Sequence, residues 1–298
     1  MTENLRVAGI ELGGTKSIAL LAEGKNILHQ VTVPTTTPDE TLSRLRTQLQ
    51  LWHTEQPFSA LGIASFGPIQ LNKDAPDFGT ILKTPKPNWT DAPVAIYLAS
   101  SFTSPWAIDT DVNGAALAEH RWGAGIGCDS LCYITIGTGL GGGVVVNGKA
   151  VHGLLHPEIG HIRVRRSAGD TFPGACPFHG DCIEGLVSGP ALAARFGRPT
   201  SEVPHTHPAW QSVADDIAEL ACTILLTTSA QRILFGGGVS SSRLFLLPMV
   251  RQRVFDRLGG YLPLPDVDTI AGIIAPPALG DLAGPLGAVA VAHLAAGK

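Results

Sequence analysis

The feature that most constrains the fold is a run of glycine near the middle of the chain. Residues 137–143 read Gly-Thr-Gly-Leu-Gly-Gly-Gly, so five of seven positions are glycine, and apolar β-type segments lie on both sides, at 131–136 and 143–146. Glycine loses more conformational freedom on folding than any other residue. The run therefore predicts a turn whose backbone must approach another group closely, as it does when several N–H groups converge on an anion.

Two further glycine turns follow β-type segments. Residues 13–16, Gly-Gly-Thr-Lys, join the segments 7–11 and 17–22 and add a hydroxyl and an ammonium group. Residues 236–238 are all glycine and follow the segment 232–235, at the carboxyl end of a strand, where α/β sheets bind ligands. The spacing is not that of a Walker loop, and each turn alone could be an ordinary hairpin. Together the three turns favour a nucleotide site.

The apolar pattern predicts alternating helices and strands. Two glycine-turned β-meanders, each followed by such an alternation, favour an α/β fold of two similar halves with a cleft between them. We place the boundary at residue 111: a small N-terminal α/β domain, 1–111, on which the helix 285–298 packs, and a larger domain, 112–284. The predicted strands are 7–11, 17–22, 27–33, 60–65, 106–109, 131–136, 143–146, 232–235 and 269–275. The predicted helices are 38–55, 113–122, 184–196, 208–229, 243–258 and 285–296.

Composition and charge exclude several classes of protein. With 298 residues, 44% of them hydrophobic, the chain can bury a sizeable core. Its 21 basic and 25 acidic residues form no basic stripe, which argues against a nucleic-acid partner. Met1–Arg6 is polar and no apolar run could span a bilayer, so we expect no membrane partner. An odd number of cysteines, five, fits a reducing compartment, and we expect a cytoplasmic protein that binds small molecules.

A compact set of soft ligands predicts a metal site. Cys176, His179 and Cys182 are spaced three apart within a short loop, and His161 lies upstream. Two thiolates and two imidazoles complete the tetrahedral set of a structural Zn²⁺, with no position left for a catalytic water. The alternative is a loop in which these residues occur incidentally. The other three cysteines lie in apolar stretches and are expected to be buried.

Several motifs, in the same order along nearly the whole chain, resemble those of the ROK family, which belongs to the actin–Hsp70–hexokinase fold. Residues 9–16, Gly-Ile-Glu-Leu-Gly-Gly-Thr-Lys, resemble the first phosphate motif of its sugar kinases, and 136–139 resemble the second. Residues 109–116 resemble the segment with the catalytic aspartate, and 156–161 resemble the E-x-G-H signature. The resemblance implies two actin-like ATPase domains, of ribonuclease H-like type, that flank a cleft.

The resemblance also implies the chemistry, the transfer of the γ-phosphate of ATP to a hexose hydroxyl with Mg²⁺. Asp111 is then the general base, because a carboxylate can take the hydroxyl proton while cations and N–H groups neutralise the phosphoryl oxygens. The competing interpretation is that Asp111 only caps the helix after it. The implied sugar contacts are Gly67, Pro68, Thr110, Asp111, Glu158 and Glu184. The implied nucleotide contacts are Glu11, Gly13, Gly14, Thr15, Lys16, Gly137, Thr138, Gly139, Gly236, Gly237 and Gly238.

Three departures from the commoner ROK pattern resemble the fructokinase branch of the family. These are Glu11 in place of aspartate, Thr110 in place of the asparagine of glucokinases, and His179 in place of cysteine. The resemblance thus implies phosphorylation of D-fructose at the 6-hydroxyl by a homodimer. The alternatives are a ROK kinase for glucose, mannose or N-acetylmannosamine, and a non-catalytic sugar-sensing ROK protein. Regulators of that last kind carry an N-terminal DNA-binding region, for which we see no room before residue 9.

Overall fold

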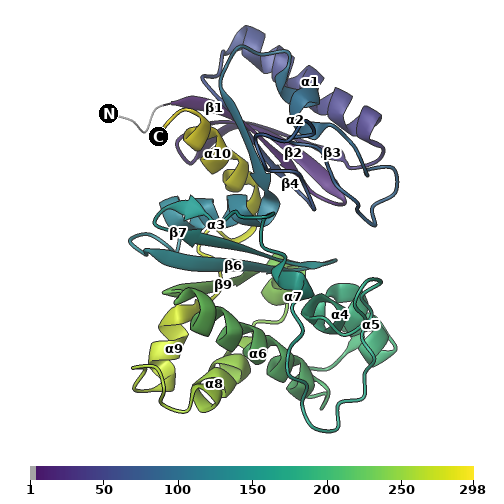
Figure 1. The fold of residues 1–298 in the computed structure, drawn as a ribbon, viewed down its shortest axis with the longest axis vertical. Coiled ribbons are helices and arrows are strands. Elements are labelled where there is room, and N and C mark those ends of the chain that lie inside the picture. The colour runs from purple at the N-terminus through teal and green to yellow at the C-terminus, as the bar shows by residue number, and fades with distance from the viewer. Residues whose placement is uncertain (1–4) are drawn as a thin grey trace. The chain divides into compact units, whose positions relative to one another are not determined.

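Two mixed α/β units make up residues 5–298, the part of the chain that this computed structural model describes (Figure 1). The first unit takes residues up to 126 together with 148–157 and 281–298, and the second takes 127–147 and 158–280. The sequence analysis placed the boundary at Asp111, whereas here the helix that starts at Asp111 lies in the first unit. Of the polar segment Met1–Arg6, residues 1–4 lie outside the described part.

The first unit contains a five-stranded sheet in the order β3-β2-β1-β4-β5. β1 (Arg6–Leu12), β2 (Lys16–Glu23) and β3 (Asn26–Pro34) form an antiparallel meander, while β4 (Leu61–Ser65) and β5 (Trp106–Thr110) run parallel to β1. The register pairs Leu12 with Ser65 and Ser65 with Thr110. The residues that follow the three parallel strands therefore emerge along one edge of this sheet.

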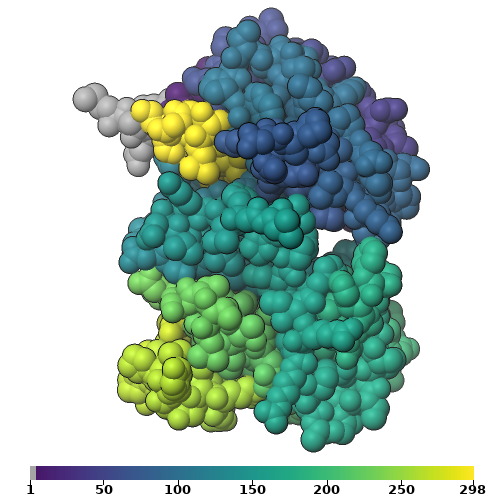
Figure 2. Space-filling model, viewed as in Figure 1, coloured from purple at the N-terminus to yellow at the C-terminus, as the bar shows by residue number. Residues whose placement is uncertain are grey.

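Four helices complete the first unit: α1 (Pro38–Glu55), α2 (Val94–Ala99), α3 (Asp111–Trp122) and α10 (Ala283–Ala295). α1 begins where its sequence predicts, because Thr37 accepts a hydrogen bond from the amide of Glu40 and Pro38 opens the first turn. α10 packs against β1, β4 and α3, and in Figure 2 its yellow surface lies among the purple and blue surface of the first unit.

The contact of α10 with its neighbours is a backbone contact. A Cβ atom at Gly62 on β4 would overlap the carbonyl oxygen of Ala288 and the amide nitrogen of Ala292. A Cβ atom at Gly287 would lie 2.5 Å from the carbonyl carbon of Gly114 on α3. Only glycine permits so short a separation, so these residues fix the depth at which α10 sits.

The second unit is built on the strands β10-β9-β6-β7 of a sheet whose fifth strand, β8, falls in the range 148–157 of the first unit. β6 (Ser130–Ile136) and β7 (Leu140–Val146) form a hairpin, β9 (Arg232–Gly236) and β10 (Ile274–Ala275) run parallel to β6, and β8 (Lys149–Ala150) is a two-residue strand. Its helices are α4 (Ile183–Val187), α5 (Gly189–Phe196), α6 (Trp210–Thr228), α7 (Gly237–Ser241), α8 (Leu246–Leu258) and α9 (Val267–Ile273). Among residues 5–298 every helix is too short or too polar to cross a bilayer.

Local capping explains two differences from the predicted elements. Of the strand predicted at 269–275 only the last two residues are a strand, β10, because Asp266 accepts a hydrogen bond from the amide of Thr269 at 2.8 Å and starts α9, which runs to Ile273. The single helix predicted at 184–196 is two helices, since Ser188 caps α5 and Pro190 opens its first turn. α2, α7 and β8 were not predicted.

The contact of α10 with β4 predicts a large loss of stability in Gly62→Ala, because the added methyl group meets backbone atoms that cannot move aside. We expect its free energy of unfolding to fall by at least about 1–3 kcal/mol, measured by urea denaturation. Gly272→Ala is the control, since Gly272 is exposed on α9 and no atom lies within 4 Å of its Cβ position. Equal shifts in the two variants would contradict the packing argument.

Candidate active site

Two acidic side chains lie at the edge where β1 and β5 end. Glu11 is the penultimate residue of β1, and Asp111 is the first residue of α3, directly after β5; both are partly buried. Burial and the neighbouring charge of Asp111 raise the pKa of Glu11 to about 7, against the opposing effect of Lys16. Burial also raises the pKa of Asp111 to about 6, although the amide of Val112 donates to its Oδ1 at 2.9 Å. Such a pair suits chemistry with a cation or a hydroxyl proton.

The helix cap at this junction is Thr110 and not Asp111. The hydroxyl of Thr110 accepts a hydrogen bond from the amide of Asn113 at 3.1 Å, and Asp111 is already the first helical residue. The interpretation of Asp111 as only a cap is therefore wrong. Thr110 was predicted to contact sugar, and its hydroxyl still carries a proton that it can donate.

A third aspartate, which the sequence analysis did not assign, fixes the start of α3. Asp109 is buried, and its Oδ1 accepts hydrogen bonds from the Nδ2 of Asn113 at 2.7 Å and from the amide of Thr110 at 2.8 Å. Its Oδ2 lies 3.0 Å from Nε2 of His152, and this contact raises the pKa of His152. Asp109 thereby fixes the chain on both sides of Asp111, through the amide of Thr110 and the side chain of Asn113.

The first glycine turn is held from outside through its carbonyl groups. The hydroxyl of Thr35 donates to the carbonyl of Gly13 at 2.7 Å, and Nζ of Lys86 donates to the carbonyl of Gly14 at 2.5 Å. Lys86 comes from a segment that Trp89 anchors, since the indole of Trp89 is buried and donates to the carbonyl of Thr36 at 2.8 Å. The turn is thus shaped before any ligand binds, in part by a lysine to which the sequence assigned no role of its own.

The loop after β4 contains the predicted sugar-site residues Gly67 and Pro68, which are joined by a cis peptide bond. The amide of Ile69 donates to Nε2 of His156 at 3.2 Å. This bond requires the Nε2 lone pair, and burial lowers the pKa of His156, so the ring is neutral there. The loop is therefore tied to the segment that leads into the E-x-G-H motif.

In the second unit, three hydrogen bonds hold the second glycine turn: one within the turn, one from the start of α5 and one to a side chain of α4. The amide of Gly137 donates to the carbonyl of Gly139 at 2.9 Å, and the amide of Gly189 donates to the carbonyl of Gly137 at 2.7 Å. Oε2 of Glu184 accepts a hydrogen bond from the amide of Leu140 at 3.0 Å. Glu184 was predicted to face the sugar, and here its carboxylate lies at this turn. Glu158, its predicted partner, is exposed.

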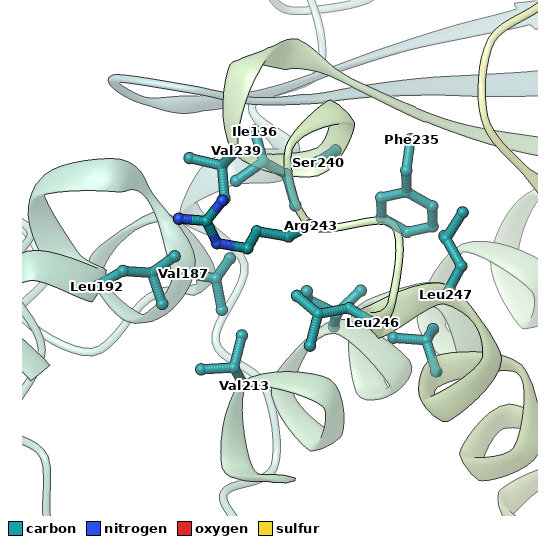
Figure 3. A pocket seen from close by; sticks show the side chains of 12 residues that line it. Ile136, Val187, Leu192, Val213, Phe235, Val239, Ser240, Arg243, Leu246 and Leu247 are labelled. Atoms are coloured by element: carbon teal, nitrogen blue, oxygen red, sulfur yellow. The ribbon is translucent and has the colours of Figure 1, made fainter. Parts of the chain in front are cut away.

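Directly after the third glycine turn, Val239 and Ser240 line an apolar cavity that was not predicted from the sequence (Figure 3). Gly237, with φ of 83°, starts α7, and the cavity lies beside that helix. Val187, Phe235 and Val239 are among its apolar walls. Arg243 is one of its few polar lining residues; it donates to the carbonyl of Thr200 at 2.7 Å, while its buried Nε lacks a partner among the described residues.

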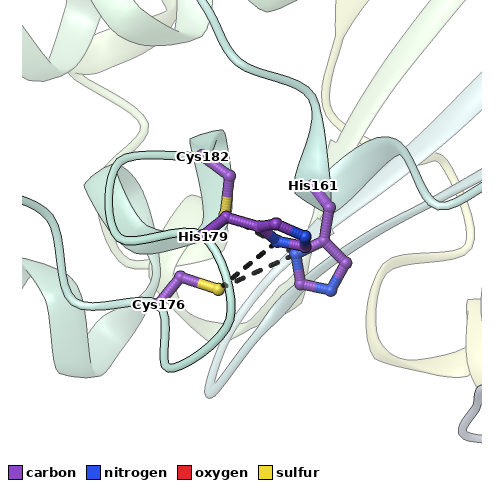
Figure 4. A group of neighbouring side chains, drawn as sticks. All are labelled: His161, Cys176, His179 and Cys182. Carbon is purple, nitrogen blue, oxygen red and sulfur yellow. Dashed lines mark hydrogen bonds between the residues drawn. The ribbon is translucent and has the colours of Figure 1, made fainter.

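The four predicted metal ligands come together in the second unit (Figure 4). One ligand atom from each of His161, Cys176, His179 and Cys182 lies within 4.8 Å of the other three. Sγ of Cys176 is 3.9 Å from Nδ1 of both histidines, and Sγ of Cys182 is 3.5 Å from Nδ1 of His161. Zn–S bonds of about 2.3 Å and Zn–N bonds of about 2.0 Å place tetrahedral ligand atoms roughly 3.3–3.8 Å apart. The set fits a zinc ion.

A buried ion network holds the same loop on the helices. Arg166 pairs with Asp170 at 2.8 Å, and Arg195 on α5 bridges Asp170 at 3.0 Å and Asp216 on α6 at 2.8 Å. Burial raises the pKa of Asp216 to about 6, whereas hydrogen bonds from Arg166 and the amide of Phe172 lower the pKa of Asp170. The segment between His161 and Cys176 is thus tied to α5 and α6.

Comparison with known proteins places the chain. The model of the ROK family matches residues 7–295, and the chain belongs to that family. A fructokinase from Zymomonas mobilis is 41% identical over 298 residues, 97% of both chains, and a fructokinase from Pediococcus pentosaceus is 37% identical over 290 residues, 97% of this chain and 98% of that protein. The crystal structure of the ROK hexokinase from Thermus thermophilus has a TM-score of 0.80 and 26% identity, and covers 98% of this chain and 99% of its own. The predicted fold class is confirmed.

The raised pKa of Glu11 predicts a pH-dependent cost to stability. A carboxyl group whose pKa rises from 4.5 to about 7 on folding supplies stability below pH 4.5 that is lost as the pH rises through 7. We expect Glu11→Gln, which cannot ionise, to melt at a higher temperature than the wild type at pH 8 and at a similar temperature at pH 4.5. Glu55→Gln, an exposed control on α1, should show no such divergence. If the difference in melting temperature between Glu11→Gln and wild type were the same at pH 4.5 and pH 8, the raised pKa of Glu11 would be contradicted.

Proposed function

We propose that this protein is an ATP-dependent fructokinase that transfers the γ-phosphate of ATP to the 6-hydroxyl of D-fructose. The observation that carries the proposal is the carboxylate of Asp111, which follows a parallel strand and lies beside a second acidic residue, Glu11. The fructokinases that are 37–41% identical over nearly the whole chain support the substrate.

Asp111 has the properties of a general base. With a pKa raised to about 6 it is ionised at neutral pH, yet it is more basic than an ordinary aspartate. It accepts the proton of the sugar hydroxyl as that oxygen attacks the γ-phosphorus and the bond from the γ-phosphorus to the β,γ-bridging oxygen breaks, so that ADP leaves. The carboxyl group then releases the proton to solvent once the sugar phosphate has departed. Asp109 keeps the start of α3 in place through Asn113 and the Thr110 amide during this step.

The donor set of the first unit fits Mg²⁺. Glu11 and Asp111 are oxygen ligands of the kind that this hard cation prefers, and burial together with the like charge of Asp111 raises the pKa of Glu11. When bound, Mg²⁺ neutralises charge on the phosphoryl oxygens. Glu11 would hold it directly or through water, while Asp111 keeps its role as base.

The nucleotide is assigned to the three glycine turns. In the first unit the amides of the turn at 13–16 and the ammonium of Lys16 suit phosphate oxygens. In the second unit the apolar cavity beside α7 suits the flat face of adenine, and Ser240 and Arg243 offer polar groups to the ring edge. The proposed ATP contacts are Glu11, Gly13, Gly14, Thr15, Lys16, Gly137, Thr138, Gly139, Gly236, Gly237 and Gly238.

The sugar is assigned to residues from the loops around Asp111 and from the E-x-G-H motif. These are Gly67, Pro68, Thr110, Asp111, Glu158 and Glu184. Glu184 can reach a sugar only with the carboxylate oxygen that it does not use on the amide of Leu140. The alternative function is a kinase for glucose, mannose or N-acetylmannosamine. Assembly as a homodimer and location in the cytoplasm stay predictions from the sequence.

A hexose panel tests the function. Purified protein with ATP and Mg²⁺ should give its highest kcat/KM with D-fructose, compared with glucose, mannose and N-acetylmannosamine, and the product should be the 6-phosphate by NMR. Asp111→Asn should lower kcat at least about a hundredfold, because the amide cannot accept the proton.

The matched control is Asp129→Asn, an exposed change of the same type in the second unit, which should leave kcat unchanged. Near-normal turnover in Asp111→Asn would show that Asp111 is not the general base. A higher kcat/KM with another hexose would show that fructose is not the preferred substrate.

We further propose that the Cys₂His₂ cluster binds a structural Zn²⁺. Elemental analysis should find about one zinc per chain, and Cys176→Ser should lose it and melt at a lower temperature, because the metal closes the loop. Cys222→Ser, a buried thiol on α6 outside the cluster, should keep its zinc. Stoichiometric zinc in Cys176→Ser would exclude this site.

A further inference from the structure

The carboxylate of Glu11 occupies space that a side chain on α10 would need. Gly284 is the second residue of α10, and a Cβ atom built on it would overlap Oε1 of Glu11 and lie 2.8 Å from its Cδ and 3.4 Å from its Oε2. Separations below about 3 Å are not tolerated between such atoms. Glu11 and a residue larger than glycine at position 284 therefore exclude each other in this geometry.

The backbone of neither residue can move away easily. Glu11 stands on β1 between two paired strands, opposite Ile18 on one side and Ala64 on the other, and its neighbours Ile10 and Leu12 are fully buried. α10 is held by the backbone contacts at Gly62 and Gly287 described above. The overlap would have to be relieved by a change in the side-chain conformation of Glu11.

Such a change would move the carboxylate away from Asp111. The register aligns Leu12 with Ser65 and Ser65 with Thr110, so Glu11 and Asp111 lie at the same edge of the sheet with only β4 between their strands. The first turn of α10 has no acidic residue of its own, and a carboxylate at a helix N-terminus is favoured by the free amide groups there. The steric room at Gly284 thus lets Glu11 keep this position in spite of its burial and the like charge of Asp111.

We propose that Gly284 is a positioning residue for phosphoryl transfer, because its missing side chain leaves the space in which the Glu11 carboxylate lies beside Asp111. This inference rests on the proposed kinase function. It makes Glu11 and Gly284 a matched pair: the shorter side chain of a Glu11→Asp variant, which lacks one carbon–carbon bond of about 1.5 Å, does not need the space at 284.

A double-mutant cycle tests the pairing in wild type, Gly284→Ala, Glu11→Asp and the double variant. With ATP, Mg²⁺ and fructose, Gly284→Ala should lower kcat about thirtyfold to a hundredfold when Glu11 is retained, since a displacement of about 1 Å has effects of this size. The KM for fructose should change less than about threefold. In the Glu11→Asp background the same substitution should change kcat by less than about threefold.

Thermal unfolding of the same four proteins without substrate supplies a readout that does not depend on activity. Gly284→Ala should lower Tm by about 5 °C when Glu11 is retained and by less than about 2 °C in the Glu11→Asp background. Gly272→Ala on α9 serves as the control for a helical glycine and should affect neither kcat nor the coupling.

Each outcome decides a separate point. Equal losses of Tm and kcat in both backgrounds would show that Gly284 serves the helix alone and would overturn the pairing. A coupled Tm with normal kcat in Gly284→Ala would overturn the positioning role. If wild type phosphorylated no hexose, the proposed function would fail, and the Tm cycle would still show whether the two residues share one space.

Discussion

The backbone contact between α10 and the centre of the first unit determines how the rest of that unit is arranged. α10 packs against β1, and it meets β4 and α3 at distances that only glycine allows, at Gly62 and at the pair Gly114 and Gly287. β1 carries Glu11 and α3 begins with Asp111. The separation of the two acidic groups is therefore set by close contacts between main chains, which are stiffer than contacts between flexible side chains.

The two acidic groups, Glu11 and Asp111, keep their positions because several hydrogen bonds fix the backbone around them. Burial and like charge raise the pKa of Glu11, which means that the folded chain disfavours the ionised form. Sites of this kind are where locally unfavourable arrangements are expected in a protein. Asp109, Thr35 and Lys86 each bond to backbone atoms beside the pair or the glycine turn, and they keep that geometry in place.

The sequence predicted those parts of the site whose chemistry is concentrated in short segments. The strand-to-helix junction at Asp111 and the spacing of Cys176, His179 and Cys182 could be recognised, because neighbours in sequence remain neighbours in the fold. Lys86, His152 and Arg243 could not, since each contacts a segment far away in sequence and no periodic pattern reveals such a contact.

Two failures in the prediction of secondary structure have the same local cause. The β-branched residues after Asp266 favoured a strand, yet one side-chain bond from Asp266 to the amide of Thr269 starts a helix. Ser188 does the same between α4 and α5. Capping acts through a single hydrogen bond, which an average over apolar positions does not register. The match of Glu11 with Gly284 was equally invisible, because 273 positions separate the two residues.

The order of synthesis gives the position of α10 a further consequence. Residues 127–280, most of which form the second unit, leave the ribosome before residues 283–295, yet α10 covers β1 and β4, which were made much earlier. Until α10 arrives, the apolar face of those strands has no cover, and the first half of the chain is exposed to aggregation for longer than the second. A nascent chain of this protein should therefore depend on chaperones mainly through its amino-terminal sheet.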